Sequence, residues 1–469
     1  ILIANMNKNI LKGKKIGITA YDLQQKEHRG IASYTKNLIK VLSENEAEVY
    51  LITNIGSQRI KRSKNKAFYE EVSVADILNL LQKGALSYGE SNLRGKISFL
   101  IKYPIKSFLN SLILLINRFK LKYKFIKVSE LQKKIHISEF KFDYLNYISG
   151  IIVVGGIFNL SIFRSMRYLF RIPQLNIKKN KLDLIITSCP ICIRNKNKNY
   201  APIVQIIHDA IPIQDPDHPR PKAFLNTLKD AHYNKCLYVS SATQKIVFNL
   251  LQISKSTNEL DIMRPLPSIS IEILNDSLNI NSILGIDKPY VLINCSIVSW
   301  KKVEKAINFF NQSNLSDRGF LLCIAGQIHN TKYCKYVKKL CAKNKNILLL
   351  GYVSEFEKVW LYLNTSSLIS TSATEGFGIP VLDAACLNIP VIANKIPSYQ
   401  EIQKVIKNNN ISLYYLNEEA KWLFKLNQTE IFDIDDIEGK KSRIKSYKEF
   451  CEVAKRDTTK KILHLSEIN

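Results

Sequence analysis

The sequence predicts an α/β protein with two Rossmann-like domains, and three observations lead to this fold class. The chain has 469 residues, more than one ordinary hydrophobic core holds. Short apolar runs alternate with segments of helical periodicity, a pattern typical of parallel sheets whose strands are connected by helices. A proline-rich break at residues 264–267, followed by a less regular stretch up to Asp287, divides this alternation into two series.

The first series predicts an N-terminal domain over residues 1–265. A helix is expected from Gly30 onward, because apolar residues recur on one of its faces, at Ile31, Tyr34, Leu38 and Val41. The apolar strands of this domain are expected at residues 15–20, 48–53, 183–188, 202–207 and 237–241.

The second series predicts a C-terminal domain over residues 288–440, after a linker at 266–287 and before a closing helix within 441–469. In open parallel sheets, ligands bind beyond the carboxyl ends of the strands, so we expect the site in the cleft between the two domains. The strands are expected at residues 290–294, 320–325, 347–350, 368–371 and 391–393, and the helices at 303–311, 332–343, 354–363 and 381–387.

An insertion at about residues 59–143 interrupts the first domain. Between Arg94 and Lys127 the chain has nine basic residues and no acidic one. Helical spacing within it (Phe108, Leu112, Leu115, Ile116 and Phe119) suggests a basic amphipathic helix that lies on an anionic membrane surface. An ordinary surface helix packed on its own domain is the alternative.

The longest uncharged run extends from Tyr144 to Phe163. Its length would suffice to cross a bilayer, which takes about 20 residues. However, it contains asparagines, serines and three glycines, and its centre at residues 151–154 reads as a buried strand, which we favour over a membrane span.

The composition favours a globular, intracellular protein with anionic partners. The formal net charge is +28, and 46% of the residues are hydrophobic. Nucleic acid is disfavoured as a partner because no zinc module, recognition helix or aromatic-basic motif is evident. The nine cysteines are scattered and no secretory signal opens the chain, so we expect a reducing cytoplasm. Cys189 and Cys192 form a lone CxxC, which we interpret as strand-capping residues rather than a metal or redox site.

The most informative segment begins with Glu375-Gly376-Phe377-Gly378, followed by Pro380 and Asp383. A strand is expected to end just before it and a helix to open at Pro380, so backbone N–H groups would attract an anion there. This segment resembles the EGFGxPxxE signature of glycosyltransferase family 4, the retaining group 1 enzymes of GT-B architecture. The resemblance implies that Glu375 is catalytic and contacts the donor sugar. It also implies that Gly376, Phe377 and Gly378 bind the donor and that Asp383, where the family has Glu, faces the ribose.

Other motifs are similar to those of this family and occur in the same order along the chain. Gly30 corresponds to the loop that approaches the donor phosphates, and His208, in Ile207-His208-Asp209, to the catalytic histidine beside the donor sugar. Lys301 and Lys302 occupy the place of the phosphate clamp. Two neighbours depart from the family: Cys295 stands in place of a glycine and Trp300 in place of an arginine.

The resemblance implies a hexosyltransferase that takes a sugar from a nucleotide-sugar donor and passes it to a saccharide acceptor, which we expect to be lipid-linked. It implies cell-envelope polysaccharide biosynthesis, retention of configuration, no cofactor, no metal ion, and a closing helix that returns to the first domain. Two Asp-x-Asp pairs, Asp215/Asp217 and Asp433/Asp435, are the alternative metal ligands, but neither directly follows a strand.

Two alternatives to a transferase remain open within the same fold. One is a degenerate, non-catalytic protein that binds nucleotide-sugar, suggested by Asp383, Cys295 and Trp300. The other is a nucleotide-sugar epimerase, although the EGFG-Pro segment favours transfer over epimerisation.

Overall fold

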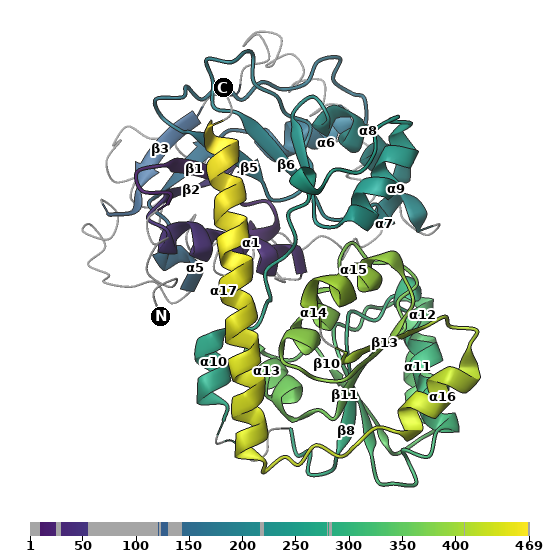
Figure 1. Ribbon diagram of the computed structural model, residues 1–469. Coiled ribbons are helices and arrows are strands. Elements are labelled where there is room, and N and C mark those ends of the chain that lie inside the picture. Colours follow the sequence, from purple (N-terminus) through teal and green to yellow (C-terminus); the bar gives the residue numbers. More distant parts are fainter. Residues whose placement is uncertain are drawn as a thin grey trace, which may run out of the picture. The chain divides into compact units, whose positions relative to one another are not determined.

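The computed structural model describes residues 10–24, 30–54, 121, 123–129, 143–215, 220–278, 280, 284–407 and 409–467. The chain divides into two compact units. The first unit comprises residues 1–239, 246–263 and 455–469, and the second comprises residues 240–245 and 264–454. Each unit is an α/β structure built on one sheet, as the sequence predicts (Figure 1).

The sheet of the first unit has seven described strands in the order β3-β4-β2-β1-β5-β6-β7. All neighbours are parallel except β3, which pairs antiparallel with β4. The strands are β1 (Lys15–Thr19), β2 (Glu48–Thr53), β3 (Tyr123–Lys127), β4 (Gly150–Val154), β5 (Leu184–Thr187), β6 (Ile203–Ile207) and β7 (Lys235–Tyr238).

Helices and short 3-10 turns connect these strands. Their apolar side chains and those of the strands form the cores of this unit. The elements are η1 (Asp22–Gln24), α1 (Gly30–Glu44), α5 (Asp143–Asn146), α6 (Ile157–Ser165), α7 (Ile211–Gln214), α8 (Pro221–Ala231), α9 (Ser241–Leu251) and η2 (Glu259–Asp261). The start of α9, up to residue 245, belongs to the second unit.

The strand predicted at residues 237–241 is displaced toward the N-terminus in the structure, where β7 ends at Tyr238. The physical reason is a helix cap. The Ser240 hydroxyl accepts a hydrogen bond from the Thr243 amide at 2.9 Å, so the chain has already left the sheet to begin α9.

The uncharged run from Tyr144 to Phe163 folds as a strand and a helix. Strand β4 is buried along its whole length, as predicted for residues 151–154, and α6 begins three residues after it. Among the described residues, we find no helix whose length and hydropathy would allow it to cross a membrane.

Most of the basic insertion lies outside the described residues, including the predicted amphipathic helix at Phe108–Phe119 and the lysines at 106, 120 and 122. The described part, β3, is an edge strand with partly exposed side chains, and Lys124 on it is exposed. An edge strand that carries lysines resists pairing with other chains.

The sheet of the second unit has six described strands, all parallel, in the order β10-β9-β8-β11-β12-β13. This order reverses after β8, so β8 and β11 lie side by side at the switch point. The strands are β8 (Tyr290–Asn294), β9 (Leu321–Ala325), β10 (Ile347–Gly351), β11 (Ser367–Ser370), β12 (Val391–Asn394) and β13 (Ile411–Tyr414).

Helices cover both faces of this sheet, with α13 and α14 on one side and α11, α12 and α16 on the other (Figure 1). The elements are α10 (Ile271–Asp276), η3 (Ser299–Lys301), α11 (Val303–Gln312), α12 (Lys332–Cys341), α13 (Glu355–Asn364), α14 (Ile379–Cys386), α15 (Pro397–Ile406), α16 (Glu419–Asn427) and α17 (Ile437–Glu467). The local sequence fixes where α13 begins, because Ser354 and Glu357 form a capping box at its N-terminus.

The long final helix α17 contributes residues to both units, because its part from Lys455 onward belongs to the first. There Lys455 forms an ion pair with Glu44 of α1 at 3.1 Å. In the second unit, Tyr447 on the same helix is fully buried.

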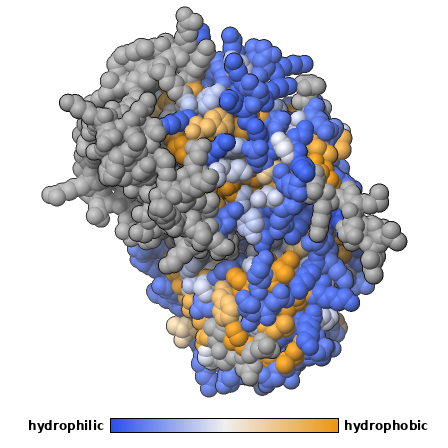
Figure 2. Space-filling view, turned by 90° about the vertical axis from the view of Figure 1, so that its left-hand side faces the viewer, coloured by the Kyte–Doolittle hydropathy of each residue, from blue (hydrophilic) through white to orange (hydrophobic). Residues whose placement is uncertain are grey.

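Where the face seen in Figure 2 is coloured, hydrophilic residues cover most of it, in keeping with the charged composition, and hydrophobic residues gather in smaller patches. Isolated exposed apolar residues are normal on protein surfaces.

Candidate functional site

The EGFG segment of the second unit forms the turn between β11 and α14. Gly378 has a left-handed backbone (φ 102°, ψ 58°) and serves as the N-cap of α14, with proline in the first helical turn. A residue with a side chain would be strained in this conformation. The segment therefore places the N-terminus of a helix at the carboxyl end of β11, as the sequence predicts.

Glu375 is held in this turn by two side chains. Its carboxylate forms an ion pair with the Lys301 ammonium, and it accepts a hydrogen bond from the Tyr399 hydroxyl at 3.2 Å. The side chains of Lys301 and Glu375 are 15% and 11% exposed, so the pair is shielded from water but not sealed. The structure thus brings together two residues that the sequence analysis predicted separately.

The loop that carries Lys301 is tied to the end of β11 by hydrogen bonds. The Thr371 hydroxyl lies 3.1 Å from the carbonyl oxygen of Lys301 and 2.9 Å from that of Lys302, and the Ala373 amide donates to the carbonyl of Trp300 at 2.7 Å. Lys302 itself has a left-handed backbone (φ 50°) and caps α11. The position of Lys301 is therefore fixed by backbone geometry.

A small pocket lies at the carboxyl ends of β8 and β11. Its lining includes Cys295, Lys301, Ser370, Glu375 and Tyr399. In a shielded pocket, an ammonium group can stabilise a developing negative charge, and the carboxylate beside it can accept hydrogen bonds from hydroxyl groups. Lys302 is not part of this lining.

The backbone of Gly376 is bound by a second motif of the sequence. Its carbonyl oxygen accepts hydrogen bonds from the hydroxyls of Ser240 at 2.6 Å and Thr243 at 3.0 Å, both at the start of α9. Phe377 is only 3% exposed and packs into the core. Gly376 and Phe377, both predicted to bind the donor, therefore shape the turn through backbone bonding and packing.

We expect Gly378→Ala to destabilise the second unit by about 2–4 kcal/mol, because the strained backbone adds to overpacking. A Cβ at this position would lie 2.4 Å from a ring carbon of Tyr399, which bonds Glu375. Gly319→Ala is the matched control, since Gly319 has φ 82° and nothing within 4 Å of its Cβ position. It should lose only about 1–2 kcal/mol.

The measurement for this pair is urea unfolding followed by tryptophan fluorescence. All three tryptophans of the chain, Trp300, Trp360 and Trp422, belong to the second unit and so report on it alone. Equal losses of stability in the two variants would show that contact with Tyr399 does not constrain the turn.

Asp383, predicted to face a ribose, is 2% exposed on α14. Its oxygens accept hydrogen bonds from the Ser268 amide at 2.6 Å and the Ser268 hydroxyl at 2.5 Å, and the Tyr447 hydroxyl lies 3.4 Å away. The carboxylate thus joins α14 to the segment after the proline-rich break and to α17. Its contact with a ribose stays a prediction.

Burial raises the pKa of Asp383 to about 6, against the hydrogen bonds from Ser268, which lower it. In the unfolded chain this pKa is about 4. The folded state therefore binds the proton more tightly, and stability is lost as pH rises from about 4 through about 6, by on the order of 3 kcal/mol.

We expect Asp383→Asn to lose this pH dependence, because an amide can accept from the Ser268 amide and donate to its hydroxyl without carrying a charge. The free energy of unfolding, measured by tryptophan fluorescence between pH 4.5 and 8, should rise relative to the unsubstituted protein as the pH increases. A difference that stays constant with pH would contradict this account. The pKa of Asp22 is also raised to about 6, but Asp22 is present in both proteins, so its contribution to the pH dependence cancels in the difference.

One glycine of this unit was missed by sequence analysis. Gly326, at the carboxyl end of β9, has φ 147°, and a Cβ there would lie 1.7 Å from the carbonyl oxygen of Cys295. The ends of β8 and β9 therefore approach too closely for any other residue. A glycine directly after an apolar strand was the available signal.

In the first unit, His208 follows the carboxyl end of β6. Its Nε2 lies 2.7 Å from the carbonyl oxygen of Ser188, and its ring meets that of Tyr34 edge-on at 4.9 Å. Burial lowers its pKa to about 4, so the imidazole is neutral at pH 7. The bond to a carbonyl fixes the tautomer that carries hydrogen on Nε2.

A buried polar cluster lies beside His208, at the carboxyl ends of β1 and β5. The Ser188 hydroxyl donates a hydrogen bond to the Asp22 carboxylate, and the Ser188 amide donates one to the Thr19 hydroxyl at 2.9 Å. Desolvation raises the pKa of Asp22 to about 6. Sequence analysis missed Asp22 and Ser188, although both follow apolar strands. Gly30 is the first residue of α1, and the residues just before it, 25–29, lie outside the described ones.

The two cysteines of the CxxC are not activated. Cys192 is buried, and burial raises the pKa of its thiol to about 12; the pKa of Cys189 is raised as well. Among the residues that the structure describes, no three His, Cys, Asp or Glu side chains are grouped to hold a metal ion. Asp217 lies outside those residues, and Asp433 and Asp435 flank an exposed turn.

Comparison with known families gives one match within the second unit. Residues 279–419 match the family model described as "Glycosyl transferases group 1". The matched segment contains Lys301, Glu375 and Asp383.

Two curated relatives are similar to parts of the chain. The O-antigen chain mannosyltransferase RfbU of Salmonella typhimurium is 26% identical over 249 residues, which make up 51% of this chain and 63% of RfbU. The serotype-specific mannosyltransferase WbdA of Escherichia coli is 38% identical over 73 residues, 14% of this chain and 9% of WbdA. The chain thus spans less than two thirds of either relative.

Solved structures match nearly the whole chain at low sequence identity. TarM of S. aureus has a TM-score of 0.51 at 14% identity, covering 98% of this chain and 100% of TarM. Sucrose-phosphate synthase of Thermosynechococcus elongatus has a TM-score of 0.52 at 12% identity, covering 96% of this chain and 98% of the synthase chain. HepE of Anabaena, solved with UDP and glucose, has a TM-score of 0.51 at 14% identity, covering 97% of this chain and 100% of the HepE chain. The predicted GT-B architecture is confirmed.

Proposed function

Because the chain belongs to group 1 of the glycosyltransferases, we propose that it transfers a hexose from a nucleotide-sugar donor to a saccharide acceptor. The observation that carries this proposal is the ion pair of Lys301 and Glu375 in a shielded pocket at the switch point of the second sheet. Ligands of doubly wound sheets bind at such a point. The family match supports the assignment to group 1 that the sequence analysis made. The narrower assignment to family 4 stays a prediction.

The chemistry of transfer assigns a role to each group in this pocket. Cleavage of a sugar–phosphate bond builds negative charge on the departing nucleoside diphosphate. The Lys301 ammonium and the N-terminus of α14 would stabilise that charge, while Glu375 accepts hydrogen bonds from the sugar hydroxyls. His208 belongs to the first unit and not to this pocket; from the family resemblance alone we propose that it contacts the sugar as an uncharged imidazole, since it is neutral at pH 7.

The identities of donor and acceptor are proposed from the relatives. TarM and HepE were solved with UDP, and RfbU and WbdA are described as mannosyltransferases, RfbU of O-antigen chains. We propose a hexosyl donor, with mannose as the first candidate, and a saccharide acceptor carried on a lipid at the cytoplasmic face of a membrane. The reaction is proposed to retain configuration, as the resemblance to family 4 implies.

A thermal-shift screen of the purified chain with UDP-, GDP- and ADP-sugars tests the donor. A true donor should raise the melting temperature by mass action, by the equivalent of about 2.7 kcal/mol at one hundred times its Kd. Transfer to a saccharide acceptor should then follow with that donor and persist in EDTA, since we propose that no metal ion or cofactor takes part. Loss of transfer in EDTA would overturn the metal-free mechanism.

A non-catalytic nucleotide-sugar-binding protein is the second candidate. The observation that favours it is the burial of Asp383 in bonds to Ser268, together with Cys295 and Trp300 near the pocket. The same screen separates the two, because a thermal shift without any transfer or donor hydrolysis would identify this candidate.

The membrane part of the proposal depends on the nine positive charges between Arg94 and Lys127. Each is worth about 1 kcal/mol near an anionic surface and is screened within about 8 Å at physiological salt. The protein should therefore pellet with anionic vesicles, less so in high salt, and poorly with neutral ones. Reversing the charges at Lys106, Lys120, Lys122 and Lys124 should release it. Equal pelleting with neutral and anionic vesicles would refute the electrostatic account.

A further inference from the structure

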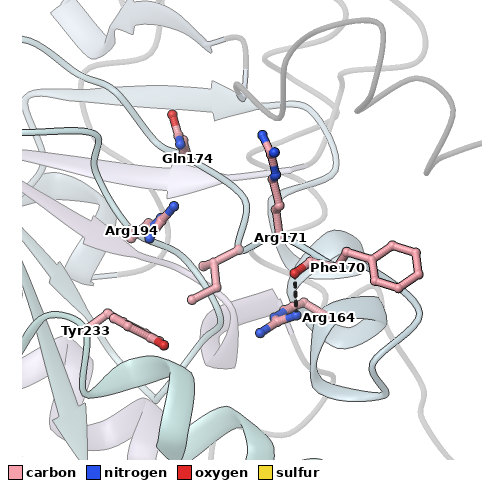
Figure 3. Close-up of a pocket in the computed structure, with 7 residues that line it drawn as sticks. Arg164, Phe170, Arg171, Gln174, Arg194 and Tyr233 are labelled. Atoms are coloured by element: carbon pink, nitrogen blue, oxygen red, sulfur yellow. Dashed lines mark hydrogen bonds between the residues drawn. The ribbon is translucent and has the colours of Figure 1, made fainter.

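A cavity of about 240 Å³ in the first unit has a strongly basic lining. We call it the arginine pocket, defined by Arg164, Arg171, Arg194, Gln174 and Tyr233. No acidic residue belongs to its lining in the described part of the chain. In Figure 3, Arg164 and Tyr233 approach from opposite sides, while the ring of Phe170 turns away from them.

The arginine pocket is separate from the site at the carboxyl ends of the strands. Tyr233 comes just before the amino end of β7, and the next residue, Asn234, donates a hydrogen bond to the carbonyl of Ile193 at 2.8 Å. His208 follows the opposite, carboxyl end of the neighbouring parallel strand β6. The donor chemistry proposed above therefore does not explain this pocket.

The walls of the pocket are held in place by hydrogen bonds. The Arg194 amide donates to the carbonyl of Pro173 at 3.1 Å, and the Leu175 amide donates to the carbonyl of Arg194 at 2.9 Å. Arg164 donates to the Leu169 and Phe170 carbonyls at 2.8 and 3.0 Å. These bonds fix the backbone beside Arg171 and Arg194 before any ligand arrives.

Among the described residues, the positive charges in and beside the pocket outnumber the carboxylates that contact them. The buried carboxylate of Asp230 is shared by Arg164, at 2.7 Å, and Arg167, at 2.9 Å. The Nε atom of Arg194 is buried and has no acceptor among the described residues. A guanidinium that holds a buried donor without a partner is costly, and an anion in the pocket would lower that cost by pairing with the charge of Arg194.

We propose that the arginine pocket binds a phosphate ester. Guanidinium groups match phosphate oxygens with two parallel hydrogen bonds, and the Tyr233 hydroxyl and Gln174 amide add neutral donors. The volume is many times what a single water needs and smaller than a typical site for a drug-sized ligand, which suits a phosphate and a small attached group.

The phosphate can come from a soluble ester or from a lipid headgroup, and two probes distinguish these sources. Full-length protein is titrated calorimetrically with sn-glycerol 3-phosphate, and it is sedimented with vesicles of phosphatidylcholine, with or without phosphatidylglycerol. We expect binding to at least one phosphate probe and none to pure phosphatidylcholine. Binding of glycerol phosphate alone identifies a soluble ligand. Because the Arg94–Lys127 segment is itself expected to bind anionic vesicles, only vesicle binding that Arg194→Gln weakens identifies a headgroup in the pocket.

Variants test whether the pocket is the site. Arg194→Gln should weaken binding at least about tenfold, the effect of losing one charge-assisted hydrogen bond. Arg171→Gln, at an exposed position, serves as a second test if the first variant folds poorly. Lys198→Gln is the matched control, because it removes one charge from an exposed site in the loop that carries Arg194.

Three results would overturn the proposal. The first is that neither probe binds. The second is that the two arginine variants bind as well as the unsubstituted protein. The third is that Lys198→Gln loses as much affinity as Arg194→Gln, which would indicate an effect of net charge only. The thermal shift with nucleotide-sugar should be the same in Arg194→Gln, so that failure of this site and failure of the donor site are told apart.

Discussion

We expect Glu375→Gln to lower kcat/KM for transfer by a factor on the order of 10²–10³, the scale for one preorganised group at a reacting centre. Glutamine keeps the shape of the side chain but removes the charge that pairs with Lys301 and accepts from Tyr399. The loss should fall on transfer far more than on folding, where it should cost about 1–3 kcal/mol. Initial rates with the donor found in the thermal-shift screen, together with urea unfolding, measure both.

Glu355→Gln is the matched control for this prediction. Glu355 lies in the same unit and pairs with Lys358 at 2.7 Å, but its side chain is 47% exposed. Exposed ion pairs contribute little, so its rate and stability should stay close to those of the unsubstituted protein. Turnover by Glu375→Gln at the level of Glu355→Gln would remove Glu375 from the reaction.

The fold could be predicted from the sequence because local patterns encode its elements. Buried parallel strands leave continuous apolar runs, and the runs at residues 15–20, 48–53 and 290–294 became β1, β2 and β8. Strands β3 and β13 were not predicted. Both are edge strands with partly exposed side chains, so their sequences lack the apolar run that identifies a central strand.

The site could be predicted only one motif at a time. Glu375 and Lys301 were each found from their local sequence, but their ion pair joins residues 74 positions apart and depends on the adjacency of β8 and β11. The partner of Asp383 was equally hidden, since Ser268 lies 115 residues away in the segment predicted to be a linker.

The cluster of Asp22 and Ser188 shows a different limit. A single aspartate after a strand is common, and nothing next to Asp22 in the chain marks it as buried. Its desolvation arises from the packing of β1 against β5, which places Ser188 within hydrogen-bonding distance. Only the three-dimensional arrangement distinguishes such a residue from an exposed turn residue.

The second large effect on transfer is expected at Lys301, the first residue of the predicted phosphate clamp. We expect Lys301→Ala to lose about 2–4 kcal/mol of transition-state stabilisation, since its ammonium lies in the pocket beside Glu375. Lys302→Ala is the natural control, because Lys302 caps α11 and does not line the pocket. It should retain most of the activity. The two variants are compared by kcat/KM for transfer and by affinity for the nucleoside diphosphate.

A double-mutant cycle with Glu375→Gln completes this test. If Lys301 acts through the ion pair seen here, the combined variant should lose less than the sum of the single losses, with a coupling of about 0.5–3 kcal/mol. A loss seen only when Lys301 and Lys302 are changed together would mean that either ammonium can serve the phosphate. If neither single variant nor the pair with Lys302 affects transfer, the departing phosphate is stabilised elsewhere, and the helix N-terminus at Gly378 becomes the first place to look.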